Sequence, residues 1–187
     1  MRAHFGRENL ANICIYNKLR INTGSVNGQT GETPDMKREY PDHPIVGVGG
    51  VVIRDNLVLL IRRGREPLKG EWSIPGGMLE LGESLKDGIK REILEETGLK
   101  VRPLEPIAVL DRIQENGGRV QFHYVIIDYV CRPAGGRLKA GSDVLDARWV
   151  DRRNLLDYKI TPKAAAVIAD AFDWFAKHKK VSSRKTR

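Results

Sequence analysis

The chain has 187 residues and a formal net charge of +8, which allows one domain with its own core and short additional segments. Its longest nearly uncharged apolar run covers residues 45–53, far short of the roughly 20 residues that a membrane-spanning helix needs, so we expect no membrane span. Cys14 and Cys131 lie far apart and suggest neither a disulfide framework nor a zinc site, so we expect a protein of the reducing cytoplasm.

The positive charge is concentrated at the ends of the chain. Residues 177–187 contain six lysines or arginines and no acidic residue, whereas acidic and basic residues balance over residues 41–176. A charge excess confined to a short end is typical of a solvated tail. We therefore assign this tail no function and do not expect a nucleic-acid-binding protein.

The chain divides into three parts by its sequence pattern. Residues 1–43 show no sustained periodicity, and a stretch rich in Gly, Thr, Ser and Asn within them is typical of a loop. We expect this segment to be disordered or extraneous, with Met36 as an alternative start of translation. A folded domain is predicted over residues 44–176, followed by the basic tail of residues 177–187.

The predicted domain consists of short strands separated by turn signals, together with two helices. Asp55-Asn56 is a two-residue hairpin signal, and Gly117-Gly118 closes a longer loop. The strand-like segments are residues 46–54, 57–63, 108–113, 120–131 and 147–150, and helical periodicity covers residues 85–96 and 162–176. Strands mixed with two helices predict an α/β fold, a sandwich in which helices cover both faces of a mixed sheet.

The first strand-like segment contains three closely spaced glycines, Gly47, Gly49 and Gly50. They resemble the beginning of a dinucleotide-binding loop, but a further required glycine is missing and no helix follows. We therefore expect them to permit close packing or a bulge within the strand.

Acidic residues gather on one face of the first predicted helix. Ser84 and Asp87 form a capping-box variant before it, and a glycine ends it at position 98. At about 100° per residue, Glu92, Glu95 and Glu96 share one face, where like charges repel unless a cation binds them. Oxygen ligands without nearby His or Cys favour Mg²⁺ or Mn²⁺ over zinc. From the residues alone, a metal site and a solvated acidic face remain equal alternatives.

Residues 77–99 resemble the signature of the Nudix hydrolases, G-x5-E-x7-R-E-U-x-E-E-x-G-U, in which U is apolar. The resemblance implies a Nudix-type α/β/α sandwich with a mixed β-sheet between helices. It also implies hydrolysis of a diphosphate bond in a nucleoside diphosphate linked to another group. All nine fixed positions match, through Gly77, Glu83, Arg91, Glu92, Ile93, Glu95, Glu96, Gly98 and Leu99.

The same resemblance assigns roles within the signature. Arg91 is expected to orient the site, and Gly76 and Gly77 to bring the loop backbone close to phosphate. The general base is left open between Glu95, Glu96 and Asp143, and Asp143 is equally compatible with capping its loop. The metal ligands implied for Mg²⁺, with Mn²⁺ as the alternative, are Glu83, Glu92, Glu95 and Glu96.

Basic and aromatic residues outside the signature are weaker candidates. Among the basic residues that precede it we favour Arg63 as a phosphate ligand, because arginine can bind phosphate through two hydrogen bonds. Trp72 is expected to be a packing residue. One of His123 and Tyr124 is expected to face the core and the other the open side of the sheet, and neither is assigned a catalytic role.

The substrate is the least constrained part of the interpretation. The stretches RGREPLKGEWSIPGG, GRVQFHYVIIDYVC and SDVLDARWV resemble the ADP-ribose pyrophosphatase branch, so ADP-ribose is favoured, giving AMP and ribose 5-phosphate. The alternative enzyme hydrolyses nucleoside triphosphates, including oxidised ones. An alternative of another class is a non-catalytic Nudix module that senses a nucleotide, but this chain keeps every signature carboxylate and has no helix-turn-helix pattern. The expected partner is a small nucleotide, and a homodimer is possible.

Overall fold

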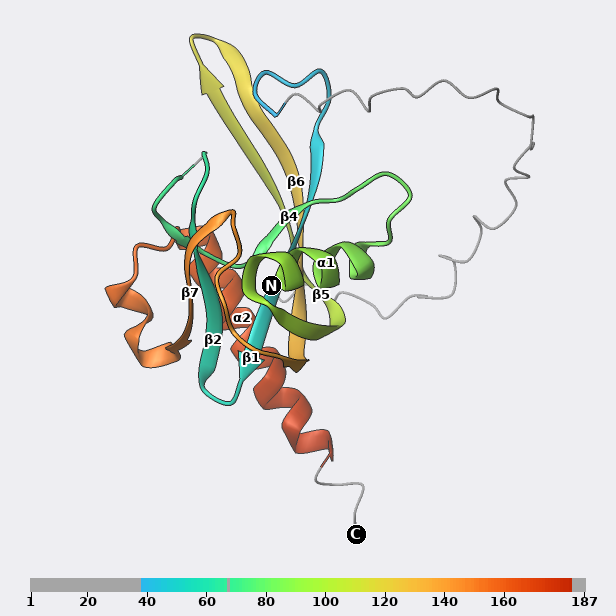
Figure 1. The fold of residues 1–187 in the computed structure, drawn as a ribbon, viewed down its shortest axis with the longest axis vertical. Coiled ribbons are helices and arrows are strands. Elements are labelled where there is room, and N and C mark those ends of the chain that lie inside the picture. Colours follow the sequence, from blue (N-terminus) through green and yellow to red (C-terminus); the bar gives the residue numbers. More distant parts are fainter. Residues whose placement is uncertain (1–37, 67, 183–187) are drawn as a thin grey trace, which may run out of the picture. The chain divides into compact units, whose positions relative to one another are not determined.

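The computed structural model describes residues 38–66 and 68–182, with side chains up to residue 178. They belong to one structural unit of the chain, which Figure 1 draws in colour. The expectations for residues 1–37, for Cys14 and for residues 183–187 lie outside the described residues.

The secondary structure contains every strand and helix that the sequence predicts. Three of them, the two strands of the second hairpin and the last helix, are longer than predicted. The second helix continues to Ser182, beyond its predicted end at residue 176. The predicted strands over residues 108–113 and 120–131 are the central parts of two 18-residue strands. The elements are β1 (Ile45–Arg54), β2 (Leu57–Arg63), β3 (Trp72–Ser73), β4 (Gly76–Met78), α1 (Leu85–Thr97), β5 (Leu99–Asn116), β6 (Arg119–Gly136), β7 (Val144–Asp151), a 3-10 helix (Arg152–Asp157) and α2 (Pro162–Ser182).

The strands form a seven-stranded mixed sheet with β1 at its centre. β1 runs parallel to β6 and pairs antiparallel with β4 through its N-terminal half and with β2 at its C-terminal end. β2 pairs in turn with β3 and β7, and β6 pairs with the edge strand β5. Because β1 changes partners from β4 to β2 along one edge, these two strands diverge from each other there.

The two helices cover opposite faces of the sheet (Figure 1). Val48 and Val52 of β1 pack with Ile89 and Ile93 of α1, while Val51 and its neighbours pack with α2. This alternation follows from the two-residue period of a strand, whose successive side chains point to opposite faces. The predicted α/β sandwich with helices on both faces is thus confirmed.

The glycines of β1 permit close packing, as the sequence predicted. A Cβ on Gly50 would overlap the side chain of Ile93, so α1 can approach the sheet only because position 50 has no side chain. A Cβ on Gly49 would overlap the carboxylate of Asp128 on the neighbouring β6. The dinucleotide-binding interpretation is excluded because these glycines lie within a strand that no helix directly follows.

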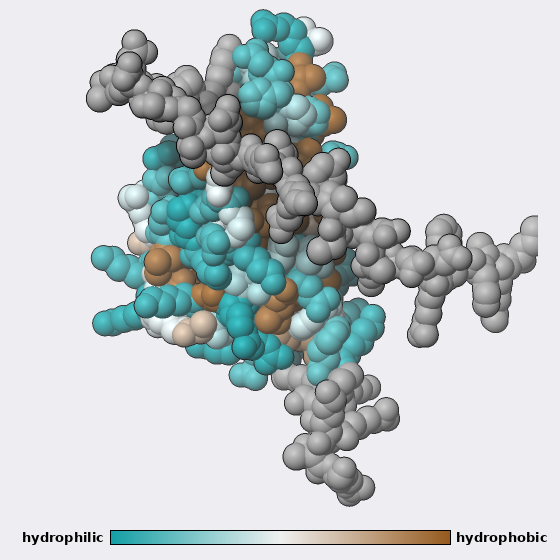
Figure 2. Space-filling view, turned by 90° about the vertical axis from the view of Figure 1, so that its right-hand side faces the viewer, coloured by the Kyte–Doolittle hydropathy of each residue, from teal (hydrophilic) through white to brown (hydrophobic). Residues whose placement is uncertain are grey.

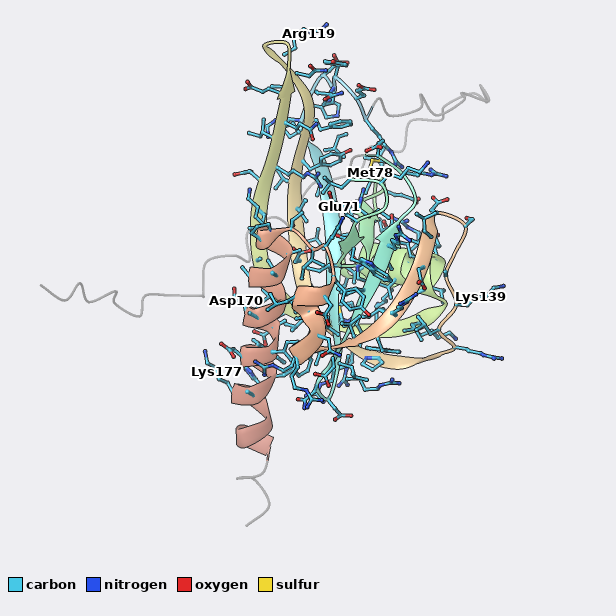
Figure 3. All side chains as sticks on the ribbon, turned by 90° about the vertical axis from the view of Figure 1, so that its left-hand side faces the viewer. Glu71, Met78, Arg119, Lys139, Asp170 and Lys177 are labelled. Atoms are coloured by element: carbon cyan, nitrogen blue, oxygen red, sulfur yellow. The ribbon has the colours of Figure 1, made fainter. Side chains whose placement is uncertain are left out.

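β5 and β6 form a long hairpin that rises from the sheet (Figure 1). Gly117 and Gly118 turn the chain at its tip with φ of 58° and 74°, a conformation that glycine adopts readily. Apolar side chains of this hairpin are exposed, among them Val109 and Ile113, and apolar residues gather near the top of one face (Figure 2). Arg119 beside the turn and Lys177 on α2 lie toward opposite ends of the described unit (Figure 3).

None of the helices in the described part of the chain combines the length and apolarity that crossing a bilayer requires. Cys131 is buried and has a free thiol.

Both ends of α1 are capped as the sequence predicts. The Ser84 hydroxyl accepts from the Asp87 N–H at 3.2 Å and donates to the Asp87 carboxylate at 2.6 Å. Gly98 has a left-handed conformation, with φ of 67°, and its N–H donates to the carbonyl of Leu94. These caps fix the length of the helix that carries the acidic face.

Replacing Gly98 by alanine should destabilise the protein more than the same change at Gly117. Both positions have positive φ, which costs an alanine about 1 kcal/mol. A Cβ at position 98 would also lie 2.7 Å from the carbonyl oxygen of Arg137, whereas nothing lies within 4 Å at position 117. We expect urea unfolding to show losses of about 2 and about 1 kcal/mol, respectively. Equal losses would contradict a close contact at Gly98.

Candidate active site

Arg91 of α1 is the centre of a charged cluster at one side of the sheet. Its guanidinium donates to both carboxylate oxygens of Glu83, at 3.0 and 2.9 Å, and to Glu92 at 2.8 Å. It also donates to the carbonyl of Met78 at 3.0 Å and contacts Glu95 at 3.5 Å. One arginine therefore ties the loop before α1 and the end of β4 to the acidic face of the helix.

The electrostatics of this cluster differ from one carboxylate to the next. The hydrogen bonds from Arg91 lower the pKa of Glu83. In turn, the hydrogen bonds to Glu83 and Glu92 and the negative charges of these two groups raise the pKa of Arg91. Burial raises the pKa of Glu92 in spite of the same arginine, because only 15% of that side chain is exposed. Glu95 is 59% exposed and lies at the rim of the cluster.

Glu96 does not contact Arg91 but points toward β4. Its carboxylate accepts the N–H of Gly76 at 2.9 Å. Burial, with smaller contributions from the neighbouring Glu92 and Asp143, raises the pKa of Glu96 to about 8, although the Gly76 hydrogen bond and the charge of Arg63 oppose this rise. A carboxylate in these surroundings gains from a nearby positive charge.

The two glycines of β4 are required by the packing of the site. Gly76 has φ of 155°, and a Cβ there would overlap the carbonyl oxygen of Val48 on β1. A Cβ on Gly77 would overlap the carboxylate of Glu92. The structure thus gives these glycines a role that the sequence did not predict: they let β1 and Glu92 approach the β4 backbone.

The predicted metal ligands are not gathered as a metal-binding cluster in the described residues, where no group of three or more His, Cys, Asp or Glu side chains is so arranged. Arg91 holds Glu83 and Glu92 and contacts Glu95, while Glu96 turns to the Gly76 N–H. These pairings relieve the mutual repulsion of carboxylates that share one helix face. The donors present are oxygen atoms of carboxylates, which is the set that suits Mg²⁺ or Mn²⁺.

Asp143 lies in the loop just before β7, across from α1. Its carboxylate accepts from Arg65 at 2.9 Å, and its carbonyl accepts the N–H of Gly64 at 3.2 Å. It therefore links the loop after β2 to the loop before β7. Arg63, at the end of β2, forms backbone hydrogen bonds with Gly70 and Glu71 and faces the same space as Glu96.

These groups surround a cavity of about 730 Å³, within the size range of small-molecule sites. Glu92, Glu96, Gly76 and Gly77 line one part, and Arg63 and Asp143 line another. The floor comes from β1, β5 and β6, and the N-terminal end of α2 adds Thr161 and Lys163. Glu83, Glu95 and Arg91 are not among the lining residues; Glu83 and Arg91 lie behind Glu92 in the charged cluster.

Several floor residues were not singled out from the sequence. Among them, Arg112 of β5 and Asp128 of β6 line the cavity. Of the two residues whose orientation the sequence left open, Tyr124 lines the cavity and His123 does not. Burial, together with the positive charge of Arg63, lowers the pKa of Arg112. Asp128 could have been identified from the sequence as a candidate site residue, because it is the one acidic residue within the apolar run VIIDYVC.

Trp72 is a packing residue, as predicted. Its ring contacts that of Tyr158 edge to face at 5.0 Å, and the guanidinium of Arg148 lies over it at 5.4 Å. It packs against the core on the α2 side of the sheet.

Sequence comparisons match the region that carries this site. A family model described as the NUDIX domain matches residues 43–171, more than two thirds of the chain. An ADP-ribose pyrophosphatase of Methanocaldococcus jannaschii is 37% identical over 138 residues, which are 71% of this chain and 75% of that protein. The human 8-oxo-dGDP phosphatase NUDT18 is 33% identical over 129 residues, which are 67% of this chain and 38% of that protein.

Solved structures share the fold. A MutT NUDIX hydrolase from Burkholderia pseudomallei has a TM-score of 0.59 at 26% identity, covering 69% of this chain and 98% of that one. The NUDIX domain of Shewanella oneidensis NrtR, solved with ADP ribose, has a TM-score of 0.60 at 20% identity, covering 72% and 90%, and shows the fold alone. The nine signature positions lie inside the matched region, and the chain is therefore a member of the Nudix hydrolase family.

Proposed function

We propose that this Nudix hydrolase cleaves the diphosphate bond of ADP-ribose to give AMP and ribose 5-phosphate. The observation that carries the proposal is the cavity that joins the half-buried carboxylates Glu92 and Glu96 to Arg63 and to the glycine backbone of β4. Support for the substrate comes from the Methanocaldococcus relative, which is named an ADP-ribose pyrophosphatase.

Nudix hydrolases generally use divalent metal ions, and the donor set of this chain fits one. Glu92 and Glu96 are acidic groups whose pKa is raised by burial, so a cation beside them would offset an unfavourable desolvation. In the proposed site Glu83, Glu92, Glu95 and Glu96 would hold Mg²⁺, or Mn²⁺ in its place. The ion would supply positive charge at the phosphate groups and would lower the pKa of the attacking water.

The remaining roles belong to the side chains and backbone around the cavity. Arg91 positions Glu83 and Glu92 through its hydrogen bonds. Gly76 and Gly77 line the cavity without side chains, so a phosphate can approach close to their backbone, and Arg63 binds a phosphate oxygen. Glu95 or Glu96 takes the proton of the attacking water. Asp143 is the weaker candidate because Arg65 already occupies one of its carboxylate oxygens.

A second candidate substrate is an oxidised nucleotide, supported by the similarity to the human 8-oxo-dGDP phosphatase. A non-catalytic sensing role is disfavoured because all nine signature positions are retained.

The substrate assignment predicts AMP and ribose 5-phosphate as the products from ADP-ribose in Mg²⁺, resolved by anion-exchange chromatography. Excess chelator should abolish turnover, and Mg²⁺ or Mn²⁺ should restore it, because the carboxylates alone cannot neutralise a diphosphate. Parallel assays use 8-oxo-dGDP and ordinary and oxidised nucleoside triphosphates. A kcat/KM about tenfold higher for any of these than for ADP-ribose, roughly 1.4 kcal/mol of transition-state preference, would overturn the assignment.

Glu95→Gln and Glu96→Gln should each lower kcat by about a hundredfold or more, because each removes an anionic ligand and nearly preserves the shape of the side chain. Glu115→Gln is the matched control, since it removes an exposed carboxylate from the β5–β6 hairpin. Circular dichroism should show the same fold for all three variants. A helix variant that stays within threefold of the wild type returns that residue to a solvated acidic face.

The Glu96→Gln variant should also change the pH dependence of stability in the presence of chelator. The carboxyl of Glu96 has a pKa of about 8 when folded, above its ordinary value of 4.5, so the folded state binds more protons between these values. The wild type should therefore lose free energy of unfolding as pH rises from about 5 to about 8, by an order of 2 kcal/mol, and the variant should lack this loss. Parallel pH profiles in urea unfolding would contradict the burial of this charge.

A further inference from the structure

Asp128 is a buried carboxylate that the proposed chemistry does not use. It lies near the middle of β6 and is 5% exposed. Within residues 38–66 and 68–182, its carboxylate forms no hydrogen bond or ion pair, and burial raises its pKa to about 6. An acidic group that keeps so little contact with water and has no partner is unfavourable for the fold, so packing alone does not account for an aspartate at this position.

The sheet makes room for this carboxylate. Gly49 of β1 lies opposite Asp128 in the parallel ladder, and a Cβ on Gly49 would overlap the Asp128 carboxylate. Tyr124 and Ile126 precede it at two-residue intervals on the same face of β6, and all three line the cavity. The carboxylate is therefore part of the cavity floor, in a space that a glycine keeps open.

The sheet register also fixes where along the cavity the carboxylate lies. Gly49 pairs with Asp128 on one side and with Gly76 on the other, and the Gly76 N–H binds Glu96. Two strand spacings, about 10 Å, thus separate the backbone of Asp128 from that of Gly76. The two carboxylates line one cavity, but Asp128 is displaced from the part where Glu92, Glu96 and the glycine backbone meet.

The charge of Asp128 limits what can bind beside it. A phosphate group would be repelled by the carboxylate, whereas O–H and N–H groups can donate to its two oxygens. In a nucleotide derivative these donors are the paired hydroxyls of a ribose and the amino and imino groups of a base. Both offer neighbouring donors that match the two oxygens of one carboxylate.

We propose that Asp128 is a specificity-determining residue that accepts hydrogen bonds from paired donors of the nucleoside part of the substrate. This inference rests on the proposed function, because it takes the ligand of the cavity to be a nucleotide. The diphosphate is hydrolysed at the part of the cavity lined by Glu92 and Glu96, and Asp128 contacts the nucleoside group that extends over the cavity floor.

The test measures binding of nucleoside monophosphates, which requires no turnover. Two ligand pairs each differ by one donor: AMP against 2′-deoxy-AMP, which lacks a ribose hydroxyl, and GMP against IMP, which lacks the base amino group. Isothermal titration calorimetry in Mg²⁺ gives dissociation constants for the wild type and for Asp128→Asn. The matched control is Asp170→Asn, which removes the same charge from an exposed residue of α2 that does not line the cavity.

The wild type should prefer the donor-bearing member of one pair by about tenfold, and the pair concerned identifies ribose or base as the source of the donors. Asp128→Asn should reduce that preference below about twofold by weakening binding of the donor-bearing ligand alone, and Asp170→Asn should retain it. Asp128→Val is a second variant that removes both acceptors and suits a buried strand, should the amide fold poorly.

A wild type without preference in either pair would overturn the proposal, as would an Asp128 variant that keeps the preference or weakens both members of a pair equally. Hydrolysis assays with ADP-ribose and 8-oxo-dGDP are run on the same proteins. Failure of the proposed enzymatic function would be recognised separately: nucleotide binding would depend on Asp128, but no substrate would be hydrolysed.

Discussion

The multiple pairing of Arg91 is the interaction on which the site depends. One guanidinium holds the loop carboxylate of Glu83, the helix carboxylate of Glu92 and the carbonyl of Met78. Its planar fork provides several donors in fixed directions, which a lysine ammonium does not. The loop before α1, the helix and strand β4 are thereby held together. The position of α1 relative to β4 in turn brings Glu96 to the Gly76 N–H.

The sheet supplies the second constraint, because residues of β1 pack against both helical layers and also line the cavity. Its side chains at Val48 and Val52 pack under α1, and its glycines accommodate Ile93 on one face and Asp128 on the other. The change of β1 partners from β4 to β2 separates the strands that carry Gly76 from those that carry Arg63. The cavity lies where these strands diverge, so the fold places acidic, basic and glycine groups around a common space.

Local features of the site could be predicted from the sequence, whereas features that depend on strand register could not. The caps at Ser84 and Gly98 and the shared face of the glutamates follow from spacing within about 15 residues of one helix. The pairing of Glu96 with Gly76 depends on how α1 packs on the sheet. The place of Asp128 in the cavity depends on its register with Gly49, which lies far away in the chain. The full lengths of β5 and β6 were missed because two long strands support each other across the hairpin and extend beyond the segments with a clear pattern.

The outer strand β5 also affects how the protein can meet other chains. An 18-residue edge strand presents unpaired backbone groups and invites the addition of another strand. Here its ladder with β6 is interrupted at several points, and two of the interruptions involve Pro103 and Pro106, which have no N–H to donate. A neighbouring molecule therefore cannot continue the sheet along the whole of this edge. Intermolecular β-sheet growth, the first step of many aggregation processes, is restricted to the short regular stretches between the irregularities.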